Sequence, residues 1–289
     1  MISIILILLF VFSVLSVPVC HGVISGLYLY GMKIFPGLFI SFILTNILVR
    51  ILQQKNINNP WILVITGLMT GFPNGAYICS WYNKNNPENR LGDMLAGIIN
   101  IPSPAFLISY VYINILEKCI SLPMFLALTY TPVILCSYMV ILLFRDKDNK
   151  KDNAPHIKTG KKLIFHFFEE AVDSSINTAL KLGAYVIIFS VIVNIIMHFS
   201  QSNTVGLLIS YLFEISNGLA IIKNAGIPMN ITVLLTVLLD AFGGVCIIMQ
   251  TKSICSSYIS IKKYIYQKLV LCIVCLLYTS PSPRDQRGS

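Results

Sequence analysis

Two acidic residues stand inside apolar runs of the sequence, and they are the first candidates for chemistry. They are Glu214 and Asp240. A charged side chain at the centre of a bilayer costs ~2.5–3.5 kcal/mol or more, so such residues usually have a function. We expect both acids to bind a coupling proton or sodium ion, with Asn217 and Gln250 as neutral ligands. The alternative for Glu214 is a place near the membrane surface, because its apolar run is short.

Four apolar runs are interrupted by glycine, proline and small polar residues. The interruptions are Gly71-Phe-Pro-Asn-Gly75, Asn100-Ile-Pro-Ser-Pro104, Glu214-Ile-Ser-Asn-Gly218 and Gly243-Gly244. A helix that breaks in hydrocarbon leaves backbone N–H and C=O groups unpaired, so breaks persist where protein or a water-filled cavity satisfies these groups. The alternative interpretation is a set of kinks packed on neighbouring helices.

The starts of broken half-helices suit a negatively charged solute. They direct N–H groups and the positive end of the helix dipole at one point, where an anion or a carboxylate binds well. Glycines let the backbone approach a ligand, and proline fits the first helical turn. We therefore predict a solute site near the middle of the membrane. Its expected residues are Gly71, Pro73, Asn74, Gly75, Asn100, Ser103, Asn217, Gly243 and Gly244.

The composition indicates the class of element that must position these residues. Of the 289 residues, 56% are hydrophobic and only 11% are charged, and the mean hydropathy is +0.77. A soluble domain carries roughly 25% charged residues. Several apolar runs approach the ~20 residues that cross a bilayer, which predicts an all-α polytopic membrane protein with about seven to nine apolar membrane segments, some broken or re-entrant.

The net charge of +9 has a simple explanation in such a protein. Cytoplasmic loops of membrane proteins collect lysine and arginine, and the positive charges here lie in short loops between apolar runs. The stretch from Arg145 to Lys162 holds seven lysines and arginines against three aspartates, so we expect it in the cytoplasm. The charge therefore gives no reason to expect nucleic acid as a partner.

The chain divides into two halves with the same order of segments. Each half contains a span, two broken segments and another span, and 34 positions separate Gly37 from Gly71 as well as Gly183 from Asn217. The expected organisation is an N-terminal membrane helix (1–22), a first repeat (27–144), a cytoplasmic basic loop with an interfacial helix (145–177), a second repeat (178–273) and a tail (274–289).

The positive loops suggest how the two halves are related. If Arg50 and Lys55 share the cytoplasm with the basic loop, one of the three apolar segments between them must be re-entrant. The same reasoning applies to the second half, which then starts on the opposite side of the membrane from the first. This arrangement is an inverted repeat, which is common in secondary transporters.

The tail differs from the rest of the chain. Hydrophobicity stops at Tyr278, and the residues that follow, TSPSPRDQRGS, resemble a translated sequencing adapter. We leave the tail out of the fold prediction, as is usual for segments foreign to the protein. On this interpretation the natural C-terminus is missing and the last helix is incomplete.

Motifs for enzymatic or metal chemistry are absent. The sequence contains no H-E-x-x-H, no G-x-x-x-x-G-K-S/T and no G-x-S-x-G, and its one C-x-x-C pair, Cys272 and Cys275, lies in an apolar run without a second pair. Buried thiols that pack as small apolar side chains are the simpler interpretation. We expect no catalytic residue, no metal and no cofactor.

Five stretches together resemble the YlbJ/SpoVV-type sporulation integral membrane proteins, which belong to the nucleoside-recognition or Gate domain group. They are Phe35-Pro-Gly-Leu-Phe39, Gly71-Phe-Pro-Asn-Gly-Ala76, Asn100-Ile-Pro-Ser-Pro-Ala-Phe106, Glu214-Ile-Ser-Asn-Gly218, and Phe242-Gly-Gly244 with Gln250. The resemblance covers about residues 27–270. It implies a spore-forming bacterium, a location in the cell or forespore membrane, and passage of dipicolinate, a small aromatic dicarboxylate.

Three functions remain open on these grounds. The first is a permease for a small anion, with dipicolinate favoured. The second is a nucleoside or other polar-solute permease coupled to H⁺ or Na⁺. The third is a non-transporting membrane component of a sporulation complex. In each case the bilayer is a partner, and whether the chain forms a homo-oligomer stays open.

Overall fold

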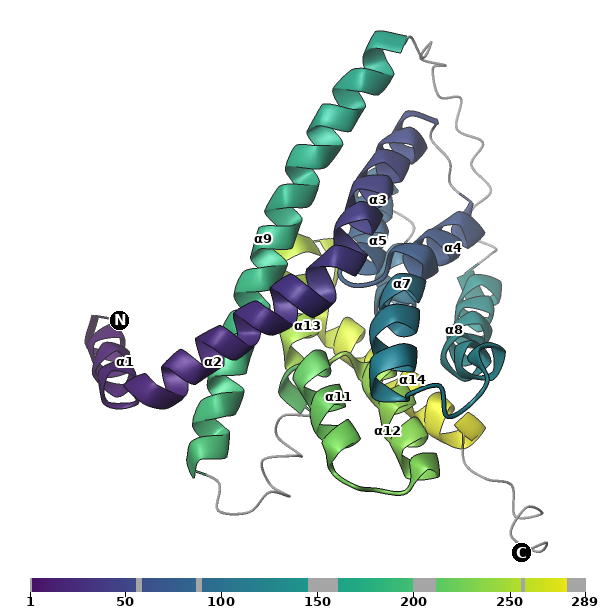
Figure 1. Cartoon of the computed structure of the whole chain (residues 1–289). Helices are drawn as coiled ribbons and strands as arrows, with labels where there is room; N and C mark the ends of the chain where they lie inside the picture. Colours follow the sequence, from purple (N-terminus) through teal and green to yellow (C-terminus); the bar gives the residue numbers. More distant parts are fainter. Residues whose placement is uncertain are drawn as a thin grey trace, which may run out of the picture.

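Helices provide all the regular structure in the described part of the chain (Figure 1). The computed structural model describes residues 2–55, 59–86, 90–144, 161–199, 212–255 and 258–279, and no strand occurs within them. The predicted all-α class is confirmed for these residues. Most of the predicted basic loop, at 145–160, and the last ten residues of the tail lie outside the described residues.

The helix boundaries follow the predicted interruptions closely. In chain order the elements are α1 (Ile2–Val14), α2 (Ser16–Tyr28), the π-helix η1 (Leu29–Ile34), α3 (Phe35–Lys55), α4 (Pro60–Thr70), α5 (Asn74–Asn85), α6 (Leu91–Ile99), α7 (Pro104–Phe106), the π-helix η2 (Leu107–Ile115), α8 (Leu122–Phe144), α9 (Lys161–Phe199), α11 (Ile215–Asn224), α12 (Met229–Phe242), α13 (Gly244–Cys255) and α14 (Ile261–Thr279). Because α14 continues to Thr279, the start of the expected tail is helical.

Five stretches of the described chain are long and apolar enough to cross a membrane. They are Ser16–Leu52, Leu91–Ile115, Leu122–Phe144, Phe168–Phe199 and Met229–Cys255. Large apolar side chains on these stretches stay exposed, among them Leu143 (75%), Leu180 (67%) and Met32 (67%). Exposed apolar surface on this scale is unusual for a soluble monomer and is expected where lipid covers it. By the length and composition of these helices, the described fold is compatible with an integral membrane protein.

Glycines set the distance at which α2 crosses α9 (Figure 1). A Cβ atom on Gly22 would lie 2.5 Å from the Cα atom of Val191, and one on Gly26 would lie 2.8 Å from that of Ile187. Small residues four positions apart allow membrane helices to approach this closely. The boundary expected at residue 22 falls inside α2, because α1 ends at Val14 and α2 continues through η1 into α3.

The helix α9 runs without interruption through 39 residues. The interfacial helix expected before residue 178 is therefore continuous with the membrane-length helix that follows it. Arg50, close to the end of α3, forms an ion pair with Glu170 in the first part of α9. The end of α3 and the start of α9 thus lie at the same end of the molecule, which is the upper end in Figure 1.

The helices α4 and α5 form a hairpin whose tip lies at residues 71–73. A Cβ atom on Gly67 in α4 and one on Gly75 in α5 would both contact Ile99, at 2.8 and 2.9 Å, so both helices lie against the end of α6. At the tip, Gly71 adopts φ = 70° and its backbone lies against Ser103. The first and second predicted interruptions therefore touch.

The fourth interruption is a left-handed turn. Gly243 and Gly244, with φ = 81° and 83°, end α12 and begin α13. This region of φ favours glycine because a Cβ atom clashes there. From the turn, α13 extends to Cys255, whose carbonyl accepts a hydrogen bond from Ser80 Oγ in α5 at 2.9 Å. The segment α12–α13 thus crosses the molecule with its break near the middle.

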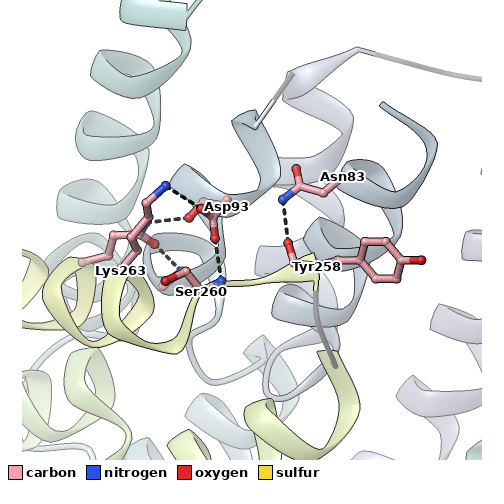
Figure 2. Close-up of polar contacts among 7 residues, drawn as sticks. Asn83, Asp93, Tyr258, Ser260 and Lys263 are labelled. Carbon is pink, nitrogen blue, oxygen red and sulfur yellow. Dashed lines mark hydrogen bonds and ion pairs between the residues drawn. The ribbon is translucent and has the colours of Figure 1, made fainter. Parts of the chain in front are cut away.

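Polar contacts from α5 and α6 fix the start of α14 (Figure 2). Asp93 in α6 is 5% exposed, and its Oδ1 accepts the N–H of Ser260 while its Oδ2 accepts from Lys263 Nζ, both at 2.7 Å. Asn83 in α5 donates to the carbonyl of Tyr258 at 3.0 Å. These contacts set the register of α14 against α6, and hence which of its side chains reach the interior.

Candidate functional site

Three of the four helix interruptions converge on one small buried cavity. Phe72 contributes from the first, Ser103 from the second and Glu214 from the third, and Gln250 reaches the cavity from α13. Its volume of about 30 Å³ has room for one or two water molecules. Residues separated by more than a hundred positions in the chain therefore share one chamber, in which Ser103, Glu214 and Gln250 are the polar lining groups that the sequence predicts.

Glu214 begins α11 and is itself buried, with 2% of its surface exposed. Its Oε2 accepts the backbone N–H of Asn217 at 2.7 Å, which is the usual role of an acidic residue at the start of a helix. The Asn217 side chain points elsewhere, because its Nδ2 donates to Ser190 Oγ in α9 at 3.0 Å. Glu214 thus faces the cavity, and Asn217 holds α11 against α9.

Gln250 has a free hydrogen-bond acceptor at the cavity. Its Nε2 contacts Cys246 Sγ at 3.1 Å, whereas its Oε1 has no hydrogen-bond partner within the described residues. The side chain is 1% exposed. A buried polar atom without a partner costs about 1–3 kcal/mol, so a solute or water in the cavity is its natural partner.

Asn100 occupies the second interruption and is fully buried, but its side chain is already in use. Its Oδ1 accepts the N–H of Ala76 at 3.3 Å, and its Nδ2 donates to Tyr264 Oη at 2.8 Å and to Thr251 Oγ1 at 3.3 Å. These bonds tie α5, α13 and α14 to the end of α6. Asn100, which was predicted to bind solute, instead holds these helices together at the second interruption.

Asn74 lines a second and larger pocket. This polar pocket has a volume of about 370 Å³ and is bordered by Asn46 of α3, Asn177 and Lys181 of α9, and Ser253 of α13. Asn74 is 4% exposed, and its Nδ2 has no hydrogen-bond partner within the described residues. The pocket contains amide, hydroxyl and ammonium groups but no carboxylate among its described lining residues, so its chemistry suits a polar or anionic solute.

The cavity and the polar pocket are lined by different parts of the same three helices. On α3, Leu38 lines the cavity and Asn46 lines the pocket. On α9, Leu182 lines the cavity and Lys181 lines the pocket. On α13, Gln250 lines the cavity and Ser253 lines the pocket. The two spaces therefore lie at different levels along α3, α9 and α13.

The glycines and Pro73 of the predicted site form the backbone of the turns. Gly71 and Gly75 allow the hairpin tip to meet residues 99–103, and Pro73 caps the start of α5. A Cβ atom on Gly243 would lie 3.1 Å from the Phe72 ring, and one on Gly244 would lie 3.1 Å from the carbonyl oxygen of Phe213. These residues bring the breaks together and do not offer side chains to a ligand.

Asp240 lies one turn before the fourth interruption and is not among the residues that line either space. It is fully buried, and neither carboxylate oxygen has a hydrogen-bond partner within the described residues. An isolated buried carboxylate is costly, so it needs a cation, a proton or a donor that the surrounding residues do not supply. Of the two acids that the sequence groups as coupling residues, only Glu214 therefore lines the cavity.

Lys268 of α14 is a functional candidate that was not predicted from the sequence. It is fully buried, and its Nζ donates to the carbonyl of Asn100 and, at 3.0 Å, to that of Ala241. The same ammonium lies 5.2 Å from the centre of the Phe72 ring. The available signal is a lysine in the middle of the last apolar run, which by the argument used for the two acids is expensive in a membrane.

Comparisons of the chain with protein-family models, with curated proteins and with solved structures found no match.

Proposed function

We propose that the chain is a membrane permease for a small polar or anionic solute, with dipicolinate as the favoured substrate. The observation that carries the proposal is the meeting of three helix interruptions at one buried cavity containing Ser103, Glu214 and Gln250. Transporters bind solutes at discontinuous helices near the middle of the bilayer, where unpaired backbone groups line a cavity. A membrane scaffold has no need for such a chamber.

The two spaces act as consecutive parts of a transport route. The cavity of about 30 Å³ has room for water but not for a larger solute, since pockets for small molecules measure about 300–1,000 Å³. The polar pocket of about 370 Å³ falls in that range. In this conformation a solute occupies the polar pocket, and opening of the cavity between Phe72, Ser103 and Gln250 carries it further.

An inverted repeat gives such a route two alternating openings. The hairpin α4–α5 is the re-entrant element of the first half, and α11 belongs to its counterpart in the second. The broken crossings α6–η2 and α12–α13 follow them, and α8 and α14 close the halves. Together with α9 and the continuous helix that α2, η1 and α3 form, these elements make eight proposed segments. Rocking of one half against the other then alternates access.

The lining of the polar pocket favours an anion over a nucleoside. Lys181 supplies a positive charge, the amides of Asn46, Asn74 and Asn177 supply donors, and no acidic side chain of the described residues lines the pocket. A lysine within a membrane-length helix is functional by default. Nucleosides lack a negative charge that would use it, so they are the second candidate class.

Coupling of transport to an ion rests on the two buried acids. Glu214 faces the cavity and can sense a solute directly, whereas Asp240 lies apart and can exchange a proton or sodium ion without contact with the solute. Either ion balances the charge of a carboxylate in the membrane interior.

Uptake of labelled dipicolinate, with uridine as comparator, tests the proposal in cells that produce the chain at a verified membrane level. Saturable dipicolinate uptake that Gln250→Leu abolishes is the expected result, because leucine keeps the volume but removes the acceptor in the cavity. Uridine uptake alone would select the nucleoside permease. Uptake of neither, with the protein correctly inserted, would overturn transport in favour of the scaffold.

A further inference from the structure

The buried ammonium of Lys268 lies between the ends of two broken helices. The carbonyl of Asn100 follows the last residue of α6, and that of Ala241 belongs to the last turn of α12. Lys268 Nζ donates to both. Because α6 and α12 come from opposite halves of the chain, one side chain of α14 joins a break in the first half to a break in the second.

Several features of this position attract a cation independently of the lysine. Helix C-termini carry partial negative charge on carbonyl groups that have no partner within the helix. The Phe72 and Tyr264 rings lie 5.2 and 5.7 Å from Nζ, within the range of cation–π attraction. Broken helices in transporters commonly use such carbonyl ends to hold Na⁺.

The lysine is an expensive residue to place there. It is fully buried, and no carboxylate of the described residues forms an ion pair with it. A buried ammonium is tolerated only where other groups replace its water shell. Here two carbonyls and two aromatic rings do so. A lysine that only filled space would be replaced at lower cost by methionine or leucine.

We propose that Lys268 is a built-in cation that fills a monovalent-cation site formed by the Asn100 and Ala241 carbonyls and the Phe72 and Tyr264 rings. The protein therefore binds no sodium ion at this position, and any sodium that couples to transport binds elsewhere. Removal of the ammonium exposes the site to small external cations. The inference concerns cation binding and does not depend on which solute, if any, is transported.

Thermal unfolding of detergent-purified protein in different chlorides tests this inference. Wild type, Lys268→Ala and Lys262→Ala are compared in sodium, methylammonium and choline chloride at equal ionic strength. We expect the melting temperature of Lys268→Ala to rise by a few degrees in sodium or methylammonium relative to choline, because choline is too large for the vacated space. Wild type and Lys262→Ala, which removes an exposed lysine of the same helix, should show no such difference.

Two results would overturn the inference. One is a melting temperature of Lys268→Ala that is the same in all three salts, since Lys268 would then be a packing residue only. The other is stabilisation of wild type and Lys268→Ala by sodium to the same extent, since removal of the ammonium would then have exposed no new cation site. If Lys268→Ala is not recovered from membranes, the same series on Lys268→Gln decides, because glutamine lacks the charge and keeps a donor.

Discussion

At the scale of single residues, Gly71 shows how much depends on one absent Cβ atom. Its φ of 70° already disfavours other residues, and a Cβ atom would lie 2.4 Å from the backbone nitrogen of Ser103. The clash is with backbone and cannot be relieved by a side-chain rotation. The contact between the first two interruptions therefore depends on this glycine.

Gly71→Ala is expected to destabilise the protein by at least about 2 kcal/mol, through strain at positive φ and separation of the two breaks. Thermal unfolding in detergent measures the loss. Two other glycines separate the contribution of backbone strain from that of the contact with Ser103. Gly226 has φ = 64° but no atom within 4 Å of the position of an added Cβ atom. Gly31 has neither a positive φ nor such a contact. The expected order of loss is Gly71→Ala, then Gly226→Ala, then Gly31→Ala. Equal losses at Gly71 and Gly226 would show that the contact with Ser103 contributes nothing.

Asp240 gives a second prediction at this scale. Asp240→Asn keeps the shape of the side chain but removes its ability to exchange a proton or to balance a cation, so solute uptake should fall to background while membrane insertion is unchanged. Asp173→Asn, at an exposed position on α9, is the control and should leave uptake intact. Normal uptake by Asp240→Asn would rule out a coupling role for this acid.

At the scale of elements, the position of α14 decides where Lys268 points. Asp93 fixes the start of this helix through Ser260 and Lys263, as Figure 2 shows, and Gln267 adds bonds to the Asp93 carbonyl and the Gly97 N–H, each at 2.7 Å. A short polar latch on α6 thus sets the register of a 19-residue apolar helix. Loss of these polar contacts should therefore also shift Lys268 in the interior.

Asp93→Ala is expected to cost about 1.5–3 kcal/mol, because it removes two charge-assisted hydrogen bonds from a buried carboxylate. Lys263→Ala should cost only about 0.2–1 kcal/mol, since the lysine side chain is 38% exposed and solvent screens its charge. Thermal unfolding of both variants beside Lys262→Ala measures the difference. A Lys263→Ala loss as large as that of Asp93→Ala would mean that the ion pair, and not the backbone contact to Ser260, holds α14.

At the scale of the whole molecule, ion pairs mark its two ends. Arg50 pairs with Glu170 at one end, and Lys223 lies 2.7 Å from Glu117 at the other. If the basic loop is cytoplasmic, the end with Glu117 and the neighbouring Cys119 faces outward. Cys119 is a free, exposed thiol and is therefore a native reporter of sidedness.

A membrane-impermeant maleimide should label intact cells that carry the wild-type chain, and Cys119→Ser should remove most of that labelling. In the Cys119→Ser background, a cysteine in place of the exposed Lys84 at the end of α5 should react only after permeabilisation, because in the proposed re-entrant arrangement the hairpin α4–α5 enters and leaves from the cytoplasmic end. Labelling of the Lys84→Cys variant in intact cells would contradict the re-entrant arrangement and the predicted orientation.

The sequence by itself determined the membrane class and the positions at which helices stop. Gly71–Pro73, Asn100–Ser103, Glu214 and Gly243 all end or begin helices as predicted. This works because glycine, proline and capping side chains act on their own backbone, and because apolar length reports directly on the bilayer. Where one helix continues into the next segment was harder to predict. In α9 a polar, amphipathic first part continues without a break into an apolar part, because a polar face does not by itself end a helix.

Only the tertiary structure decided which of these residues can meet a solute. Ser103, Glu214 and Gln250 share a cavity. In contrast, the Asn100 side chain forms hydrogen bonds with three other segments, and Asp240 does not line the cavity. Lys268 became a candidate only when its carbonyl partners, 168 and 27 positions away, were seen beside it. The physical reason is that the neighbours of a side chain are set by the packing of helices distant in sequence, which local backbone preferences do not encode.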